Sequence, residues 1–93
     1  MFELGRTLAT PGALAALEQA GESPELYLSR HHSCDWGELT DEDKRLNDDA
    51  LKDGSRILSA YRTKIGVRLW IITEAVSDQG RRAATTILLP DEY

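Results

Sequence analysis

Two histidines, the only cysteine, a tryptophan and five acidic residues lie within thirteen residues, in the segment HHSCDWGELTDED from His31 to Asp43. Side chains of these types could hold a metal ion. A zinc site, however, needs three or four ligands, usually in cysteine and histidine pairs separated by a few residues. His31 and His32 are adjacent, so on a helix they would diverge by about 100°, and Cys34 has no cysteine partner. We therefore predict neither a metal nor a cofactor.

The same segment is also a poor candidate for nucleophilic chemistry. A reactive cysteine needs a helix N-terminus or a nearby cation to lower its pKa, whereas Asp35 and Glu38 bring negative charge close to Cys34. The chain contains neither a G-x-S-x-G serine motif nor a phosphate-binding glycine loop. We interpret residues 31–37 as an unreactive connector in which Trp36 packs over a helix junction. The alternative is that Trp36 is a partner-binding hot spot.

Size and charge limit the classes of function. The 93 residues carry a net charge of −5 and are 41% hydrophobic, which predicts one soluble domain over residues 1–93. Residues 1–53 hold twelve acids and five bases (−7), and residues 54–93 hold four acids and six bases (+2). This balance argues against direct binding to nucleic acid or membranes. The N-terminus lacks the pattern of a secretory signal, so we predict a cytoplasmic protein.

Three helices are predicted in the first half of the chain. Thr10 and Pro11 have the types of an N-cap and a first helical residue, and Gly21 closes that helix. A second helix starts at Ser23-Pro24 and runs to about residue 30 or 31. Thr40, followed by three acids, starts a third helix that ends near Gly54.

The second half has the composition of strands. Residues 56–62, 67–73 and 84–89 read RILSAYR, VRLWIIT and ATTILL, which are rich in β-branched and aromatic residues. Short links between them predict an antiparallel meander, because parallel neighbours need a long crossover. LGRTLA, residues 4–9, has the composition of a short additional edge strand. The predicted fold is α+β, with three short N-terminal helices packed on a C-terminal three-stranded antiparallel meander.

Alternation along the strands places side chains on two faces of this sheet. Arg62, Arg68 and Trp70 have even numbers, whereas the aliphatic Leu69 and Ile71 have odd ones. A first hairpin loop of three or five residues would keep the arginines on the face of Trp70, and a loop of four would separate them. The sequence leaves both registers open. The candidate partner-binding residues are Trp36, Arg56, Arg62, Arg68 and Trp70.

Several stretches carry a family resemblance. DWGELTDEDKRLND, GSRILSAYR, LWIITEA and TTILLPDEY, with TPGALAALEQAG before them, resemble small bacterial proteins encoded on plasmids and other mobile elements. Members of this family are usually described as uncharacterised and are often called plasmid-related protein. They tend to have a shorter link than VSDQGRRAA before TT, so the last hairpin of this chain is longer. The resemblance implies a protein of a mobile genetic element.

Three functions are compatible with these patterns. The first is a non-catalytic binding or regulatory protein of a mobile element that contacts an unknown protein partner, for example to antagonise a host system. The second is a small metal-independent ribonuclease toxin that uses the sheet face, with catalytic residues His31, Arg56, Ser59, Tyr61 and Glu74. In the third, the sheet face is a homodimer interface. The acids of residues 41–49 are either a nucleic-acid mimic or a solvated helix start.

Overall fold

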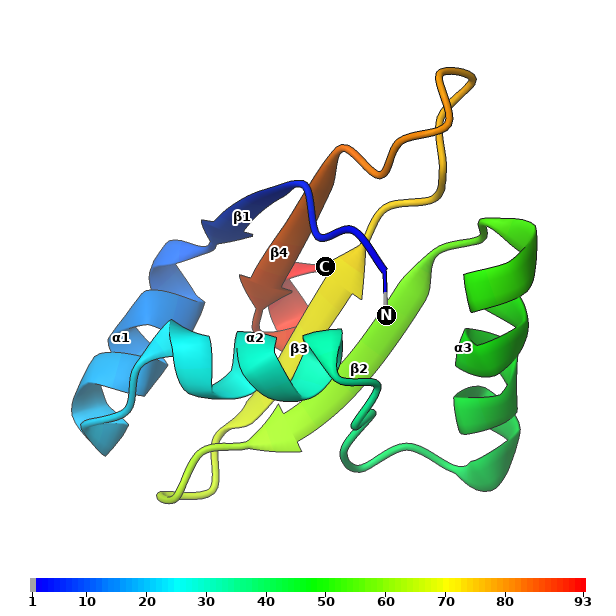
Figure 1. Ribbon diagram of the computed structural model, residues 1–93. Coiled ribbons are helices and arrows are strands. Elements are labelled where there is room, and N and C mark those ends of the chain that lie inside the picture. The colour runs from blue at the N-terminus through cyan, green and yellow to red at the C-terminus, as the bar shows by residue number, and fades with distance from the viewer. Residues whose placement is uncertain (1) are drawn as a thin grey trace.

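The computed structural model describes residues 2–93 and has an α+β fold built around a four-stranded mixed sheet (Figure 1). In chain order the elements are β1 (Arg6–Ala9), α1 (Pro11–Ala20), α2 (Pro24–His32), α3 (Asp41–Asp53), β2 (Ile57–Arg62), β3 (Arg68–Thr73), β4 (Ala84–Leu88) and the 3-10 helix η1 (Pro90–Glu92). Helix α2 crosses in front of the sheet and η1 lies behind it (Figure 1). Within residues 2–93, every helix is too short or too polar to cross a lipid bilayer.

The predicted arrangement of these elements is wrong in two respects. The helices lie mid-chain, between β1 and β2, and are not N-terminal to the whole sheet. The sheet has the order β1-β4-β3-β2 with β1 parallel to β4, and is not a three-stranded antiparallel meander. The amides of Arg6 and Thr10 donate to the carbonyls of Ala83 and Ile87, each at 3.0 Å. Parallel pairing needs a long connection, which here comprises three helices and two strands. The pairing of β1 with β4 therefore cannot be predicted from local sequence patterns.

The helix boundaries follow the local capping signals. The Thr10 and Thr40 hydroxyls accept the amides of Ala13 and Asp43, at 3.2 and 3.1 Å, as the sequence predicts for N-caps. Gly21 and Gly54 adopt φ values of 67° and 82° at the C-terminal ends of α1 and α3. These left-handed values suit glycine because it has no Cβ.

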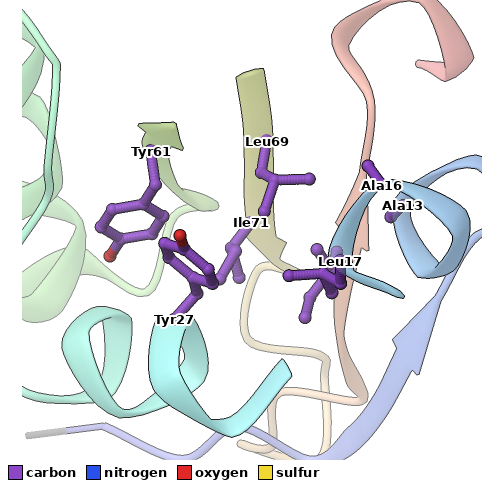
Figure 2. Packing of buried hydrophobic residues seen from close by; sticks show 8 residues of the cluster. Ala13, Ala16, Leu17, Tyr27, Tyr61, Leu69 and Ile71 are labelled. Atoms are coloured by element: carbon purple, nitrogen blue, oxygen red, sulfur yellow. The ribbon is translucent and has the colours of Figure 1, made fainter. Parts of the chain in front are cut away.

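The odd-numbered sheet residues face α1 and α2 and form the main core. Tyr27 of α2 and Tyr61 of β2 lie side by side, with ring centroids 5.5 Å apart (Figure 2). The buried members of this cluster are Ala13, Ala16, Leu17, Tyr27, Tyr61, Leu69, Ile71 and Ile87. A second, smaller cluster joins Trp36, Ala50 and Ile57 beside α3. Helix α3 therefore extends the core at the edge of β2.

The even-numbered residues form the opposite face of the sheet, which we call the open face. Its side chains are those of Leu58, Arg62, Arg68, Trp70, Ile72, Glu74, Thr86 and Leu88. Arg62 pairs with Arg68, and Leu58 pairs with Ile72, so the hairpin loop spans residues 63–67. Of the two registers left open by the sequence, this is the one that keeps the arginines with Trp70.

Candidate functional site

His31 lies at the centre of a buried chain of hydrogen bonds. Its Nδ1 lies 2.5 Å from the Ser59 hydroxyl and its Nε2 lies 2.8 Å from the Thr73 hydroxyl. The Thr73 and Thr85 hydroxyls are 2.7 Å apart, and that of Thr85 donates to the Leu4 carbonyl at 2.7 Å. These hydrogen bonds connect α2 to β2, β3, β4 and the segment before β1.

The carbonyl at one end of this series of hydrogen bonds fixes the direction of each bond as far as His31 Nε2. A carbonyl can only accept, so Thr85 donates to Leu4 and must accept the proton of Thr73. Thr73 has no second proton and therefore accepts from the Nε2–H of His31. Burial disfavours a second proton on the ring, so Nδ1 is unprotonated and accepts from the Ser59 hydroxyl. His31 is thus a neutral imidazole that carries its proton on Nε2.

Ser59 and His31 resemble the nucleophile and base of a hydrolase, but no substrate can reach them in this conformation. Both residues are 0% exposed. The group beyond His31 is the neutral Thr73 hydroxyl, which cannot stabilise an imidazolium as the carboxylate of a catalytic triad does. Within residues 2–93, every buried side-chain nitrogen and oxygen has a hydrogen-bond partner. The network therefore holds secondary-structure elements together.

Burial of this histidine makes folding sensitive to acid. Desolvation, with a smaller contribution from the charge of His32, lowers the pKa of His31 from 6.5 to about 4. The unfolded chain would take up a proton near pH 6.5 and the folded chain would not. The free energy of unfolding is therefore highest above pH 6.5. It falls by about 1.4 kcal/mol per pH unit toward pH 4, a total of about 3 kcal/mol. Urea unfolding between pH 4 and 7.5 measures this slope.

The control for the pH dependence is His31→Gln, which removes the titrating group. Its free energy of unfolding should be lower at pH 7 but nearly constant between pH 6.5 and 4.5. Most carboxylates titrate at about pH 4 and below, so they contribute little in this window. An equal slope in both proteins would show that His31 is not the group responsible.

The structure does not bring the five predicted ribonuclease residues together. His31 and Ser59 meet inside the core, and Tyr61 is 1% exposed, with its hydroxyl donating to the Asp35 carbonyl at 2.6 Å. Glu74 belongs to the exposed open face, and the exposed Arg56 contacts Tyr93, which lies against that face. The sheet therefore separates the buried His31, Ser59 and Tyr61 from the exposed Arg56 and Glu74.

The connector that follows α2 has a structural role. Trp36 is 5% exposed, and its Nε1 donates to Asp48 at 3.3 Å, in agreement with the predicted packing role. A partner could not contact this ring in this conformation. Cys34 has a φ of 66°, so it ends α2 in the left-handed conformation that glycine usually provides. Among residues 2–93, no three His, Cys, Asp or Glu side chains are grouped so that they could hold a metal ion.

Two polar side chains that the sequence analysis did not single out stabilise the edge of β2 and the end of α3. The side-chain amide of Asn47 accepts from the backbone N–H of Leu58 at 3.1 Å and donates to the Leu58 carbonyl at 2.6 Å. It thus makes the two hydrogen bonds that a neighbouring strand would make. Arg82 is 5% exposed and donates to the carbonyls of Ala50, Ser55 and Glu74. An asparagine on the inner face of α3 is the one signal that could have indicated such a role.

Accessible apolar and cationic groups meet on the open face instead. Trp70 is half-buried and contacts the ring of Tyr93, with centroids 5.9 Å apart. The Arg56 guanidinium lies 5.5 Å from the Tyr93 ring and donates to its hydroxyl. Arg62 forms an exposed ion pair with Glu38 at 2.9 Å. This surface therefore combines an aromatic centre, aliphatic neighbours and arginines.

No family model, curated protein or solved structure matches the chain. The predicted likeness to plasmid-encoded proteins therefore stays a prediction.

Proposed function

We propose that this protein is a non-catalytic binding protein that acts through protein–protein contacts made by the open face. The observation that carries the proposal is the position of Trp70, Leu58 and Ile72 on the sheet face opposite α1 and α2, with arginines beside them. Aromatic and arginine side chains supply most of the energy in protein interfaces. The Ser59–His31 pair, by contrast, is inaccessible.

The charges of the open face favour an acidic partner. Arg62 and Arg68 are directly opposite one another on neighbouring strands, an arrangement of like charges that destabilises a sheet. A carboxylate from a partner would relieve that repulsion and would compete with Glu38 for Arg62. The protein as a whole carries −5, which disfavours the phosphate backbone of a nucleic acid. An acidic protein surface with an apolar centre is therefore the best-matched partner.

The biological setting is also part of the proposal. The resemblance to mobile-element proteins would make the partner a host protein whose activity is inhibited or regulated. A free, partly exposed Cys34 is consistent with a reducing, cytoplasmic environment.

Substitutions on the open face should weaken binding without affecting the fold. We expect Trp70→Ala to weaken the partner about 30-fold or more, because it removes the central aromatic contact. Arg68→Glu should weaken it about tenfold and reduce the salt dependence of association. The measurement is quantitative affinity capture from a nuclease-treated host lysate, followed by titration of the captured protein.

The matched control is Arg81→Glu, the same charge reversal at the tip of the exposed β3–β4 hairpin, where Arg81 makes only a 3.4 Å pair with Glu3. It should bind like the unmodified protein. Equal capture by all three variants would show that the open face is not the binding surface. A partner lost on nuclease treatment would indicate nucleic acid instead.

A further inference from the structure

The segment Pro90–Tyr93 lies against the open face and already occupies part of it. Glu92 accepts the Thr10 hydroxyl and the amides of Gly12 and Leu89, so it fixes this segment to the start of α1. Tyr93 contacts Trp70 and Arg56 but is still 70% exposed. The backbone is therefore anchored by Glu92, while the Tyr93 ring is held by two surface contacts.

The Arg56–Tyr93 pair stands between two hollows. One, of about 340 Å³, is lined by Ile72, Leu88 and Tyr93 among others. The other, of about 180 Å³, is lined by Leu39, Leu46, Asn47, Arg56 and Leu58 among others. Leu58 and Ile72 are direct partners across β2 and β3, so the apolar floor continues from one hollow to the other beneath the pair. A change of Tyr93 rotamer would join the hollows into one groove.

We propose that Tyr93 is an internal occupant of the binding surface, which the partner displaces with an aromatic residue flanked by carboxylates. This inference rests on the proposed function of the open face. The chemistry of the partner segment follows from what now sits there: a ring against Trp70, a hydrogen-bond acceptor for Arg56, and acidic neighbours in Asp91 and Glu92. An incoming carboxylate would replace the neutral Tyr93 hydroxyl at Arg56 and form the stronger, charge-assisted bond.

Displacement needs little rearrangement. Only the side chain of Tyr93 has to move, because Glu92 keeps its contacts with Thr10 and Gly12 at the start of α1 and with the Leu89 amide. The closed position reduces the apparent affinity by the fraction of molecules in which the groove is open. Tyr93 therefore acts as a gate. Only a partner whose contacts with the groove outweigh those of the Tyr93 ring would bind tightly.

The test uses short synthetic peptides and follows the backbone amide signals of β2 and β3 by NMR, which every variant retains. One peptide carries a tyrosine between aspartates and glutamates, a second has alanine in place of that tyrosine, and a third has lysines in place of the acids. A single-stranded RNA of similar length is the fourth probe. The proteins are the unmodified chain, Tyr93→Ala, Trp70→Ala and the control Leu26→Ala, which removes another exposed apolar side chain, on α2.

We expect Tyr93→Ala to bind the acidic tyrosine peptide about five- to tenfold more tightly than the unmodified chain, because one aromatic contact no longer competes. Leu26→Ala should match the unmodified chain, Trp70→Ala should not bind, and the other two peptides should bind weakly. Unchanged or weaker peptide binding by Tyr93→Ala would overturn the gate, as would preferential binding of RNA.

The capture experiment distinguishes failure of the gate from failure of the proposed function. If capture of a host protein depends on Trp70 and Arg68 but Tyr93→Ala does not tighten it, only the gate is wrong. If capture is independent of Trp70 and Arg68, the binding surface itself is wrong.

Discussion

Replacing His31 by alanine is expected to lower the free energy of unfolding by about 3–5 kcal/mol at pH 7. The substitution leaves the Ser59 hydroxyl without its acceptor in a site that is 0% exposed. It also opens a cavity beside Phe2 and Trp36, whose rings lie 5.2 and 5.8 Å from the imidazole. Urea unfolding followed by far-ultraviolet circular dichroism measures the loss.

The neighbouring His32 provides the matched control for this prediction. It is only partly buried and its ring lies 5.9 Å from that of Phe2, so His32→Ala should cost less than about 1 kcal/mol. Similar losses in both variants would mean that the hydrogen-bond chain contributes little to stability. Ser59→Ala combined with His31→Leu should recover part of the loss, because two apolar groups leave no unpaired donor.

The spacing of His31 along α2 shows how far sequence reasoning could go. Tyr27 and His31 are four residues apart, so they share a helix face. That face is the buried one, and both residues are at most 2% exposed. From the sequence, His31 is expected near a helix end and is a candidate catalytic residue, but its partners Ser59 and Thr73 lie on strands far along the chain. The identity of those partners depends on the tertiary fold.

Helix caps and strand pairing differ in predictability for the same reason. The caps at Thr10 and Thr40 bond to amides three residues away, so the sequence contains the whole interaction. The pairing of β1 with β4 joins residues nearly eighty positions apart, and the sequence RTLA does not indicate which strand it pairs with. The contacts of Tyr93 with Trp70 and Arg56 are equally non-local. Local chemistry therefore predicted the elements, while their arrangement and the occupied part of the open face came only from the structure.

Gly37 is a second position at which a substitution should have a large effect, here by adding one methyl group. It has a φ of 73°, and an added Cβ would lie 2.0 Å from the Ala60 carbonyl oxygen and 2.7 Å from the Tyr61 ring. Two backbone hydrogen bonds on either side of Gly37 would have to break: that from the Glu38 N–H to the Ala60 carbonyl, and that from the Ala60 N–H to the Trp36 carbonyl. We expect Gly37→Ala to cost about 3–5 kcal/mol, from left-handed strain and the loss of two backbone hydrogen bonds.

Gly66→Ala separates these two causes. Gly66 has a φ of 89°, but an added Cβ there would meet nothing within 4 Å. This variant should therefore show the conformational cost alone, about 1–2 kcal/mol. The excess cost of Gly37→Ala then measures the attachment of the connector to the edge of β2, which also positions Trp36 against Ala50 and Ile57. Equal destabilisation by the two substitutions would show that the connector is not held against β2 in solution. In that case the edge of β2 beside Ala60 would be free to pair with another strand.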